Sequence, residues 1–247
     1  MTELADGSIF VPAPNGGTQA GITVVLKRLA ASRSFRLTVK DGARAVLTMP
    51  KYASKKETLA FLEKNADWLL EKTATAKRAK TFAQYLLEGG AVYALGREIS
   101  VQTIPSRTSP FFVDDFENGK LVFALARENQ DAQIQKLFLE YAAEKLQILC
   151  AQLSEQTGLK FSRVSVRDQS SRWASRSTSG TLSLNWRIML LKPEHQKYVV
   201  LHELAHTKFM DHSVSFWIFL NRICPNAQKL DREISRLGGE IFAVKLV

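Results

Sequence analysis

The sequence predicts an α+β protein with two lobes. Short alternating or β-branched runs fill its first half, apolar residues at helical spacing dominate its second half, and a histidine pair lies on a predicted helix. With 247 residues and 45% hydrophobic composition, the chain can bury one large core or two modest ones. We expect a flexible leader at 1–20, an antiparallel β-rich lobe with one helix at 21–128, and a helical lobe with a small sheet at 129–247.

The leader is rich in proline and glycine and has no hydrophobic period. Three runs separated by polar turns then predict an antiparallel meander. These predicted strands are Ile22–Leu29, Phe35–Lys40 and Ala45–Met49. Ser54 and Glu57 have the spacing of a capping box, which begins a helix predicted over 54–75.

Two hairpins complete the predicted first lobe. One turns at Gly96-Arg97, between strands at Ala91–Leu95 and Glu98–Ile104. The other turns at 117–119, between Phe111–Val113 and Leu121–Ala124.

The second lobe opens with a long helix, predicted from Asp131 to Thr157 and stopped by Gly158. Two strands and three helices follow it. They are predicted at Phe161–Val166, at Thr181–Trp186, from Pro193 onward, at Ser213–Ile223 and at Asn226–Leu237.

The helix that starts at Pro193 carries the sequence His202-Glu203-Leu204-Ala205-His206. Residues four apart on a helix differ by about 40° in azimuth and about 6 Å along the axis, so both imidazoles can reach one ion. Glu203 lies one position away from the ligand face, where it can take a proton from a metal-bound water. The motif therefore predicts a hydrolytic metal centre with Glu203 as general base.

Catalytic zinc usually has three protein ligands, and His212 follows His206 by six residues. We expect His212 to fold back and complete a site for one zinc ion. Asp211 is the alternative third ligand, although capping a helix or supporting the site from outside is the more ordinary role for it. His195, the remaining histidine, is predicted to lie on the surface.

Charge and composition restrict the partners. The formal net charge is +10, and from Lys160 onward there are 14 Lys and Arg against 7 Asp and Glu. Such a field favours anionic partners but is equally compatible with a solvated basic surface. No membrane span and no secretory signal is evident, so we expect a soluble, cytoplasmic protein. Cys150 and Cys224 lie in apolar helical stretches and are expected to be buried and reduced.

A block of motifs in the second lobe carries a family resemblance. It comprises Arg172-Trp173-Ala174-Ser175, Leu182–Arg187, Pro193, Tyr198–Val200, His202–His206, His212-Ser213 and Phe216-Trp217. This block resembles the YgjP-like metal-dependent hydrolase family, most strongly over Val164–Phe219. The resemblance implies a zincin-like lobe related to SprT and WLM domains, with His202, His206 and His212 as ligands and Glu203 as catalytic base.

Two positions depart from the family pattern, which usually reads Arg-Trp-Gly-Ser-Cys. Here Ala174 replaces the glycine and Arg176 replaces the cysteine, so any role of that cysteine is absent. Arg172, at the start of this segment, is a candidate contact for an oxyanion or a phosphate, because its guanidinium suits planar and trigonal anions. Its segment would lie beside the zinc helix, where a strand edge can pair with an extended substrate.

Three functions follow from these features. The first is peptide hydrolysis by a water that zinc and Glu203 activate. The second is hydrolysis of a nucleoside triphosphate, with the basic residues of the second lobe holding phosphates. The third is a nucleic-acid-associated module, either a DNA-linked protease or one with a structural zinc. Structural zinc usually has four ligands, whereas only three are evident here, which favours chemistry.

Overall fold

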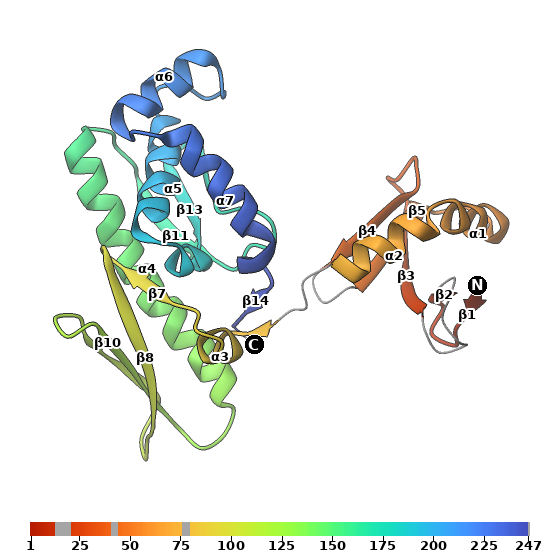
Figure 1. Cartoon of the computed structure of the whole chain (residues 1–247), viewed down its shortest axis with the longest axis horizontal. Helices are drawn as coiled ribbons and strands as arrows, with labels where there is room; N and C mark the ends of the chain where they lie inside the picture. Colours follow the sequence, from red (N-terminus) through yellow and green to blue (C-terminus); the bar gives the residue numbers. More distant parts are fainter. Residues whose placement is uncertain (13–20, 41–43, 76–79, 247) are drawn as a thin grey trace. The chain divides into compact units, whose positions relative to one another are not determined.

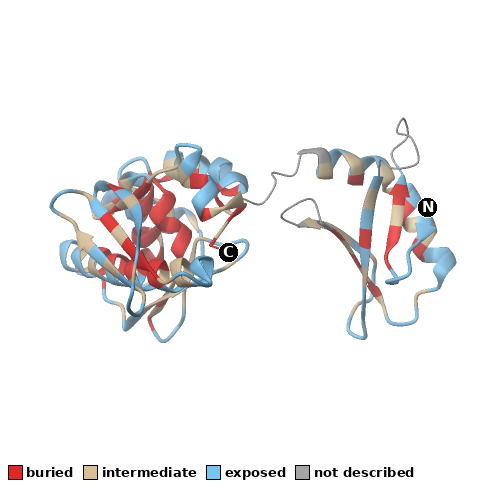
Figure 2. Ribbon diagram, turned by 90° about the horizontal axis from the view of Figure 1, so that it is seen from below, coloured by how far each residue is buried: buried red, intermediate tan, exposed pale blue. Residues whose placement is uncertain are grey.

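The chain folds as two compact units, Met1–Ala79 and Lys80–Val247 (Figure 1). The computed structural model describes residues 1–12, 21–40, 44–75 and 80–246. Helices and sheets occur in both units, which confirms the predicted α+β class. Each unit has its own hydrophobic core (Figure 2).

The first unit contains one five-stranded sheet. Its strands are β1 (Thr2–Glu3), β2 (Ile9–Pro12), β3 (Gly21–Leu29), β4 (Arg36–Lys40) and β5 (Arg44–Pro50), in the order β1-β2-β3-β5-β4. The predicted meander is wrong, because β5 runs parallel to β3 and separates it from β4. Alternation indicates which face a side chain occupies, but it does not indicate which strands are neighbours.

The start of the chain belongs to this sheet. β1 pairs with β2, and Ile9 and Val11 are buried in the core of the first unit. The prediction of a flexible leader is therefore wrong for residues 1–12, where two apolar side chains are enough to fix a strand. Residues 13–20 lie outside the described part of the chain.

Two helices, α1 (Lys55–Lys64) and α2 (Ala66–Thr75), supply the other layer of this unit. The predicted capping box is present, with Ser54 as N-cap and Glu57 returning a hydrogen bond to it. The single helix predicted over 54–75 breaks at Asn65, whose side chain donates to the carbonyl oxygen of Phe61 at 2.8 Å. This bond satisfies one of the carbonyls that the end of α1 leaves open.

The second unit contains a small sheet that packs on the long helix α4 (Gln130–Thr157). Its strands are β7 (Val92–Ala94), β8 (Arg97–Pro105), β9 (Phe111–Asp115) and β10 (Lys120–Leu125), in the order β7-β8-β10-β9. Both predicted hairpins are confirmed. The predicted end of α4 is confirmed too, because Gly158 takes the left-handed conformation at its C-cap with φ 71°.

The predicted boundary after residue 128 separates elements that share one core. Phe123 of β10 is fully buried, and its ring lies 6.4 Å from that of Phe138 in α4. Lys145 of α4 is also buried and forms an ion pair with Asp114 of β9. The structure therefore divides after Ala79, and residues 80–128 belong to the unit that carries the histidines.

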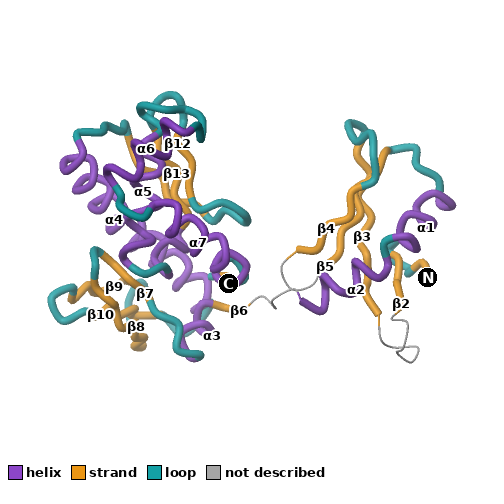
Figure 3. Tube along the Cα trace, turned by 45° about the horizontal axis from the view of Figure 1, so that its top comes forward, coloured by secondary structure: helices purple, strands orange, loops and turns teal. Residues whose placement is uncertain are grey.

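The rest of the second unit surrounds the helix α5 (Pro193–Ala205) (Figure 3). A three-stranded sheet has the order β11-β13-β12, with β12 at an edge. The remaining elements are β6 (Lys80–Thr81), α3 (Phe82–Leu87), β11 (Arg163–Arg167), β12 (Ala174–Arg176), β13 (Thr181–Asn185), the 3₁₀ helix η2 (Trp186–Leu190), α6 (Val214–Ile223), α7 (Ala227–Ile241) and β14 (Val244–Lys245). None of the helices in the described residues is both long and apolar enough to cross a bilayer.

Candidate metal centre

The three histidines predicted as ligands come together at the end of α5. His202 lies on its last turn, His206 is its C-cap, and His212 lies on the loop that leads into α6. Backbone hydrogen bonds from Thr207 and Lys208 to the last turn of α5 reverse the chain direction at this point. The ligand nitrogens of the three histidines all lie within 4.8 Å of one another.

The spacing of these nitrogens suits a tetrahedral ion. Nε2 of His202 lies 3.0 Å from Nε2 of His212. Zinc bonds of about 2.0–2.1 Å at a tetrahedral angle place two nitrogens about 3.3 Å apart. Very small shifts would therefore bring His202 and His212 to the separation that zinc requires.

Burial favours the neutral form of His202 and His206, the form that can ligate a metal. Burial lowers the pKa of His202 to about 3, and the neighbouring His206 and His212 lower it further. Burial also lowers the pKa of His206. The Nδ1–H of His206 donates to the carbonyl oxygen of Phe209 at 2.9 Å, which leaves Nε2 free to face the cluster.

Phe216 of α6 packs against all three histidines of the cluster. It is fully buried, and its ring centroid lies 4.9–5.0 Å from those of all three histidines. The ring of Trp217 lies farther away, at 6.4 Å from the rings of His202 and His212. Both residues pack against the cluster, so α6 fixes the positions of the three histidines.

Glu203 points from α5 toward the edge strand β12. It is 7% exposed, and burial raises the pKa of its carboxyl to about 7 against the opposing influence of the Arg176 main-chain N–H and of the Arg172 and Arg176 charges. A carboxyl with a pKa near neutrality is well suited to accept and return a proton.

The edge of β12 presents main-chain groups next to this carboxyl. Asn185 donates its N–H to the carbonyl of Trp173, and Ser177 donates its N–H to the carbonyl of Thr181, so the odd-numbered residues of this segment pair with β13. In an antiparallel pair the residues between them face the opposite way. The N–H and C=O groups of β12 at its even positions therefore point away from β13, and one of these N–H groups contacts Glu203.

Arg172 lies in a cavity of about 240 Å³ beside the histidines. The cavity is lined by Arg172, Trp173, Ala174, Tyr198, Val199, His202, Glu203, Asp231 and Ile234. Arg172 is exposed, and its charge acts on Glu203. The predicted substrate-contact residue is thus brought to the predicted base.

Asn185 anchors the polar connection that precedes β12. It is fully buried, and its side-chain amide donates to the carbonyl oxygens of Gln169 and Arg172 at 2.8 and 3.0 Å. Asn185 thus holds this connection by hydrogen bonds at the end of β13. Trp186 is fully buried, whereas Trp173 is only partly buried.

Asp211 takes the more ordinary of its two predicted roles. It is exposed, and its carboxylate accepts a hydrogen bond of 3.4 Å from the N–H of Ser213, the N-cap of α6. It is absent from the group of close ligand atoms found among the described residues.

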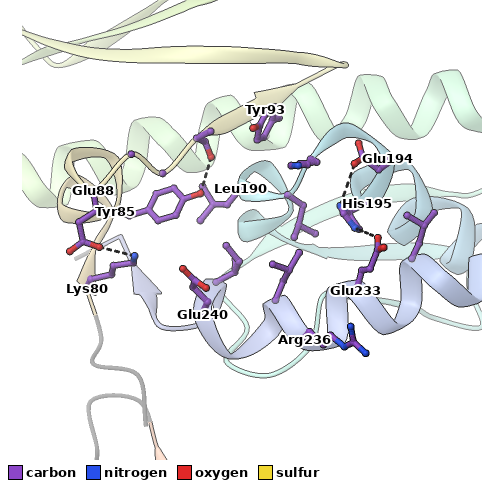
Figure 4. A pocket seen from close by; sticks show the side chains of 18 of the residues that line it. Lys80, Tyr85, Glu88, Tyr93, Leu190, Glu194, His195, Glu233, Arg236 and Glu240 are labelled. Atoms are coloured by element: carbon purple, nitrogen blue, oxygen red, sulfur yellow. Dashed lines mark hydrogen bonds and ion pairs between the residues drawn. The ribbon is translucent and has the colours of Figure 1, made fainter. Parts of the chain in front are cut away.

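The prediction that His195 lies on the surface is wrong. His195 is 6% exposed, and its Nε2 lies 3.0 Å from Oε2 of Glu233 in α7. The helix α7 packs across α5 and covers its first turn, a contact that local spacing cannot show. Both residues line a separate cavity of about 860 Å³, which also includes Lys80, Tyr85 and Arg236 (Figure 4).

Sequence reasoning missed one residue near the cluster. Asp231 of α7 accepts a hydrogen bond of 2.8 Å from the hydroxyl of Tyr198, which in turn lies 3.1 Å from Nδ1 of His202. Tyr198 was predicted only as a core residue. The position of Asp231 depends on how α7 packs on α5, and no sequence motif signals it.

Comparison with protein families agrees with this geometry. The sequence model of the YgjP-like family, described as YgjP-like, metallopeptidase domain, matches residues 33–237. The chain is also similar to the crystal structure of the metallopeptidase zymogen of Pyrococcus abyssi abylysin, with 28% identity and a TM-score of 0.34 over 37% of this chain and 94% of that chain. No curated protein matches the sequence.

The cluster of three histidines and the buried carboxyl beside it fit a metal-dependent hydrolase of α+β fold. The family match covers most of the chain. The protein belongs to the YgjP-like family of metallopeptidase domains.

Proposed function

We propose that this protein is a zinc-dependent peptidase. His202, His206 and His212 would hold one zinc ion, and Glu203 would act as general base. The observation that carries this proposal is the convergence of three imidazoles, whose ligand atoms all lie within 4.8 Å of one another. The buried carboxyl of Glu203, on the helix that carries two of them, lies beside the edge strand β12. Three imidazoles with no thiolate leave a coordination position for chemistry.

The chain's own groups suit hydrolysis of a peptide bond. Bound zinc supplies Lewis acidity to this site. Glu203 takes a proton from the attacking water and returns it to the leaving amine nitrogen. The even-numbered main-chain groups of β12 hold an extended substrate by strand pairing, and Arg172 stabilises the oxyanion that forms at the scissile carbonyl.

The proposal is tested with Glu203→Gln and with Glu194→Gln, a matched change on the first turn of the same helix, where Glu194 is exposed. We expect Glu203→Gln to bind zinc like the parent protein and to lose peptide cleavage by several orders of magnitude, because a general base typically contributes about 10²–10⁴-fold. Glu194→Gln should keep both properties. Equal peptidase activity in the Glu203 variant would refute the assigned base.

A nucleoside triphosphate is the second candidate substrate, because Arg172 and Arg176 both act electrostatically on Glu203 and could hold phosphates there. A screen of the zinc-loaded protein against casein, a peptide library and the four nucleoside triphosphates separates the two. Pyrophosphate release with every peptide intact would replace the peptidase proposal. Steeply salt-dependent DNA binding would instead support a nucleic-acid-associated protease.

A further inference from the structure

Tyr198 and Asp231 form a chain of hydrogen bonds behind His202, on the side away from the other histidines. The Tyr198 hydroxyl donates to Oδ1 of Asp231 at 2.8 Å and lies 3.1 Å from Nδ1 of His202. We propose that Asp231 and Tyr198 are positioning residues, which hold the His202 ring in the tautomer and orientation that bind a metal through Nε2. This inference rests on the proposed metal site but on no particular substrate.

The direction of the hydrogen bonds follows from the available protons. A carboxylate can only accept, and a tyrosine hydroxyl has a single hydrogen. Because the Tyr198 hydrogen points to Asp231, the other contact of this hydroxyl must be the acceptance of a hydrogen from His202. Nδ1 of His202 therefore carries the proton, and Nε2 keeps its lone pair.

The same contacts fix the ring plane. Tyr198 precedes His202 by one helical turn, and their rings meet edge to face with centroids 5.7 Å apart. The centroid of the Phe216 ring lies 5.0 Å from that of the His202 ring. Nε2 of His202 lies 3.0 Å from Nε2 of His212. The His202 ring therefore contacts two aromatic rings and is oriented by the Tyr198 hydroxyl.

The other two candidate ligands, His206 and His212, form no hydrogen bond with Tyr198 or Asp231 among the described residues. The Nδ1–H of His206 is held by a main-chain carbonyl, that of Phe209, which no side-chain substitution removes. His212 lies on an exposed loop, and among the described residues its only hydrogen-bond contact is with His202. Removing the Tyr198 hydroxyl therefore acts directly on His202 and reaches His212 only through its contact with His202.

Asp231 connects the metal centre to α7. It lies on the second turn of that helix, which packs against α5 (Figure 1). Tyr198 is 1% exposed, and both it and the partly exposed Asp231 line the cavity of about 240 Å³ beside the histidines. A partner that orients a metal-binding histidine typically affects metal affinity by about 10–100-fold.

The test compares Tyr198→Phe with Tyr85→Phe in the full chain. Tyr85 is a matched control, because its buried hydroxyl donates to the carbonyl of Ala91 at 3.0 Å in the same unit but outside the histidine cluster. Zinc affinity is measured without substrate, by competition with a chromophoric chelator. We expect Tyr198→Phe to bind zinc about 10–100-fold more weakly and Tyr85→Phe to bind it like the parent. A Tyr198→Phe variant that binds zinc as tightly as the parent and the Tyr85→Phe variant would overturn the proposal.

Asp231→Leu and the double variant Tyr198→Phe/Asp231→Leu make the test independent of general packing. Since the two residues act in series on one histidine, the double variant should lose no more affinity than Tyr198→Phe alone. Additive losses would contradict an action through His202. Asp231→Asn, which keeps an acceptor oxygen, should recover part of the affinity and serves if the leucine variant does not fold. If the variants show these zinc affinities but the parent protein cleaves no peptide, the proposed peptidase function is refuted. The positioning role of Tyr198 and Asp231 then still stands.

Discussion

The ring of Phe216 stacks on the ring of His206, with centroids 4.9 Å apart and an interplanar angle of 26°. Phe216 is fully buried and also meets His202 and His212. The candidate metal centre, with two histidines at the end of α5 and one on the following loop, thus packs on one buried aromatic ring.

Replacing Phe216 should lower both the free energy of unfolding and the affinity for zinc. We expect Phe216→Ala to lower the free energy of unfolding by about 3–5 kcal/mol and to weaken zinc binding, because the three imidazoles lose their common packing partner. Phe216→Leu should show a smaller loss of each. Urea denaturation and chelator competition provide the two measurements. A Phe216→Ala variant with the parent's zinc affinity would show that the ligands hold their geometry unaided.

His212 should be needed for the metal and not for the fold. It lies on an exposed loop and its ring contacts are with the cluster and α6, so His212→Ala should change the free energy of unfolding of the metal-free protein by only about 0.5 kcal/mol. Elemental analysis after dialysis should show a marked loss of zinc. Asp211→Ala is the control, and it should retain a full equivalent. If Asp211→Ala lost the metal instead, the third ligand would be misassigned.

The contact between His195 and Glu233 should stabilise the packing of α7 on α5. Glu233→Leu leaves Nε2 of the buried His195 without its partner and should lower the free energy of unfolding by about 1–3 kcal/mol. Zinc affinity should not change, because neither residue belongs to the histidine cluster. Glu194→Gln serves as the comparison, since its carboxylate lies 4.0 Å from Nδ1 of His195 and is exposed. Equal stability of both variants would mean that this contact contributes nothing.

The pair Lys145 and Asp114 tests the revised unit boundary. Asp114→Ala leaves the buried Lys145 ammonium without its main partner and should destabilise the histidine-bearing unit by about 3–5 kcal/mol. Adding Lys145→Met should recover much of the loss, because the unpaired charge is then gone. Thermal unfolding is monitored through the release of zinc, which reports on the unit that carries the histidines. Unchanged zinc release on heating would place β9 outside the cooperative unit.

The sequence predicted local features well. The spacing of His202 and His206 on a helix, the capping box at Ser54 and the glycine stop at Gly158 each depend on neighbours within a few residues, and all three are present. The elements of the candidate site were therefore predictable, including the return of His212 to the cluster.

The features that sequence reasoning missed depend on contacts between distant segments. The parallel pairing of β3 with β5 requires a neighbour order that alternation does not contain. The burial of His195 and the contact of Asp231 with Tyr198 both depend on α7, which packs on α5 from more than 20 residues downstream. The boundary after Ala79 likewise depends on which hydrophobic faces share a core, a property that element type alone does not give.

The shortest strands of the second unit have a consequence for its connectivity. β6 and β14 pair in parallel, with Val244 opposite Lys80 and Lys245 opposite Thr81. The first residues of the histidine-bearing unit and its last strand therefore lie side by side. A unit closed in this way behaves as a module, which can be spliced into a surface loop of a host protein or circularly permuted without separating α5 from the elements that hold its histidines.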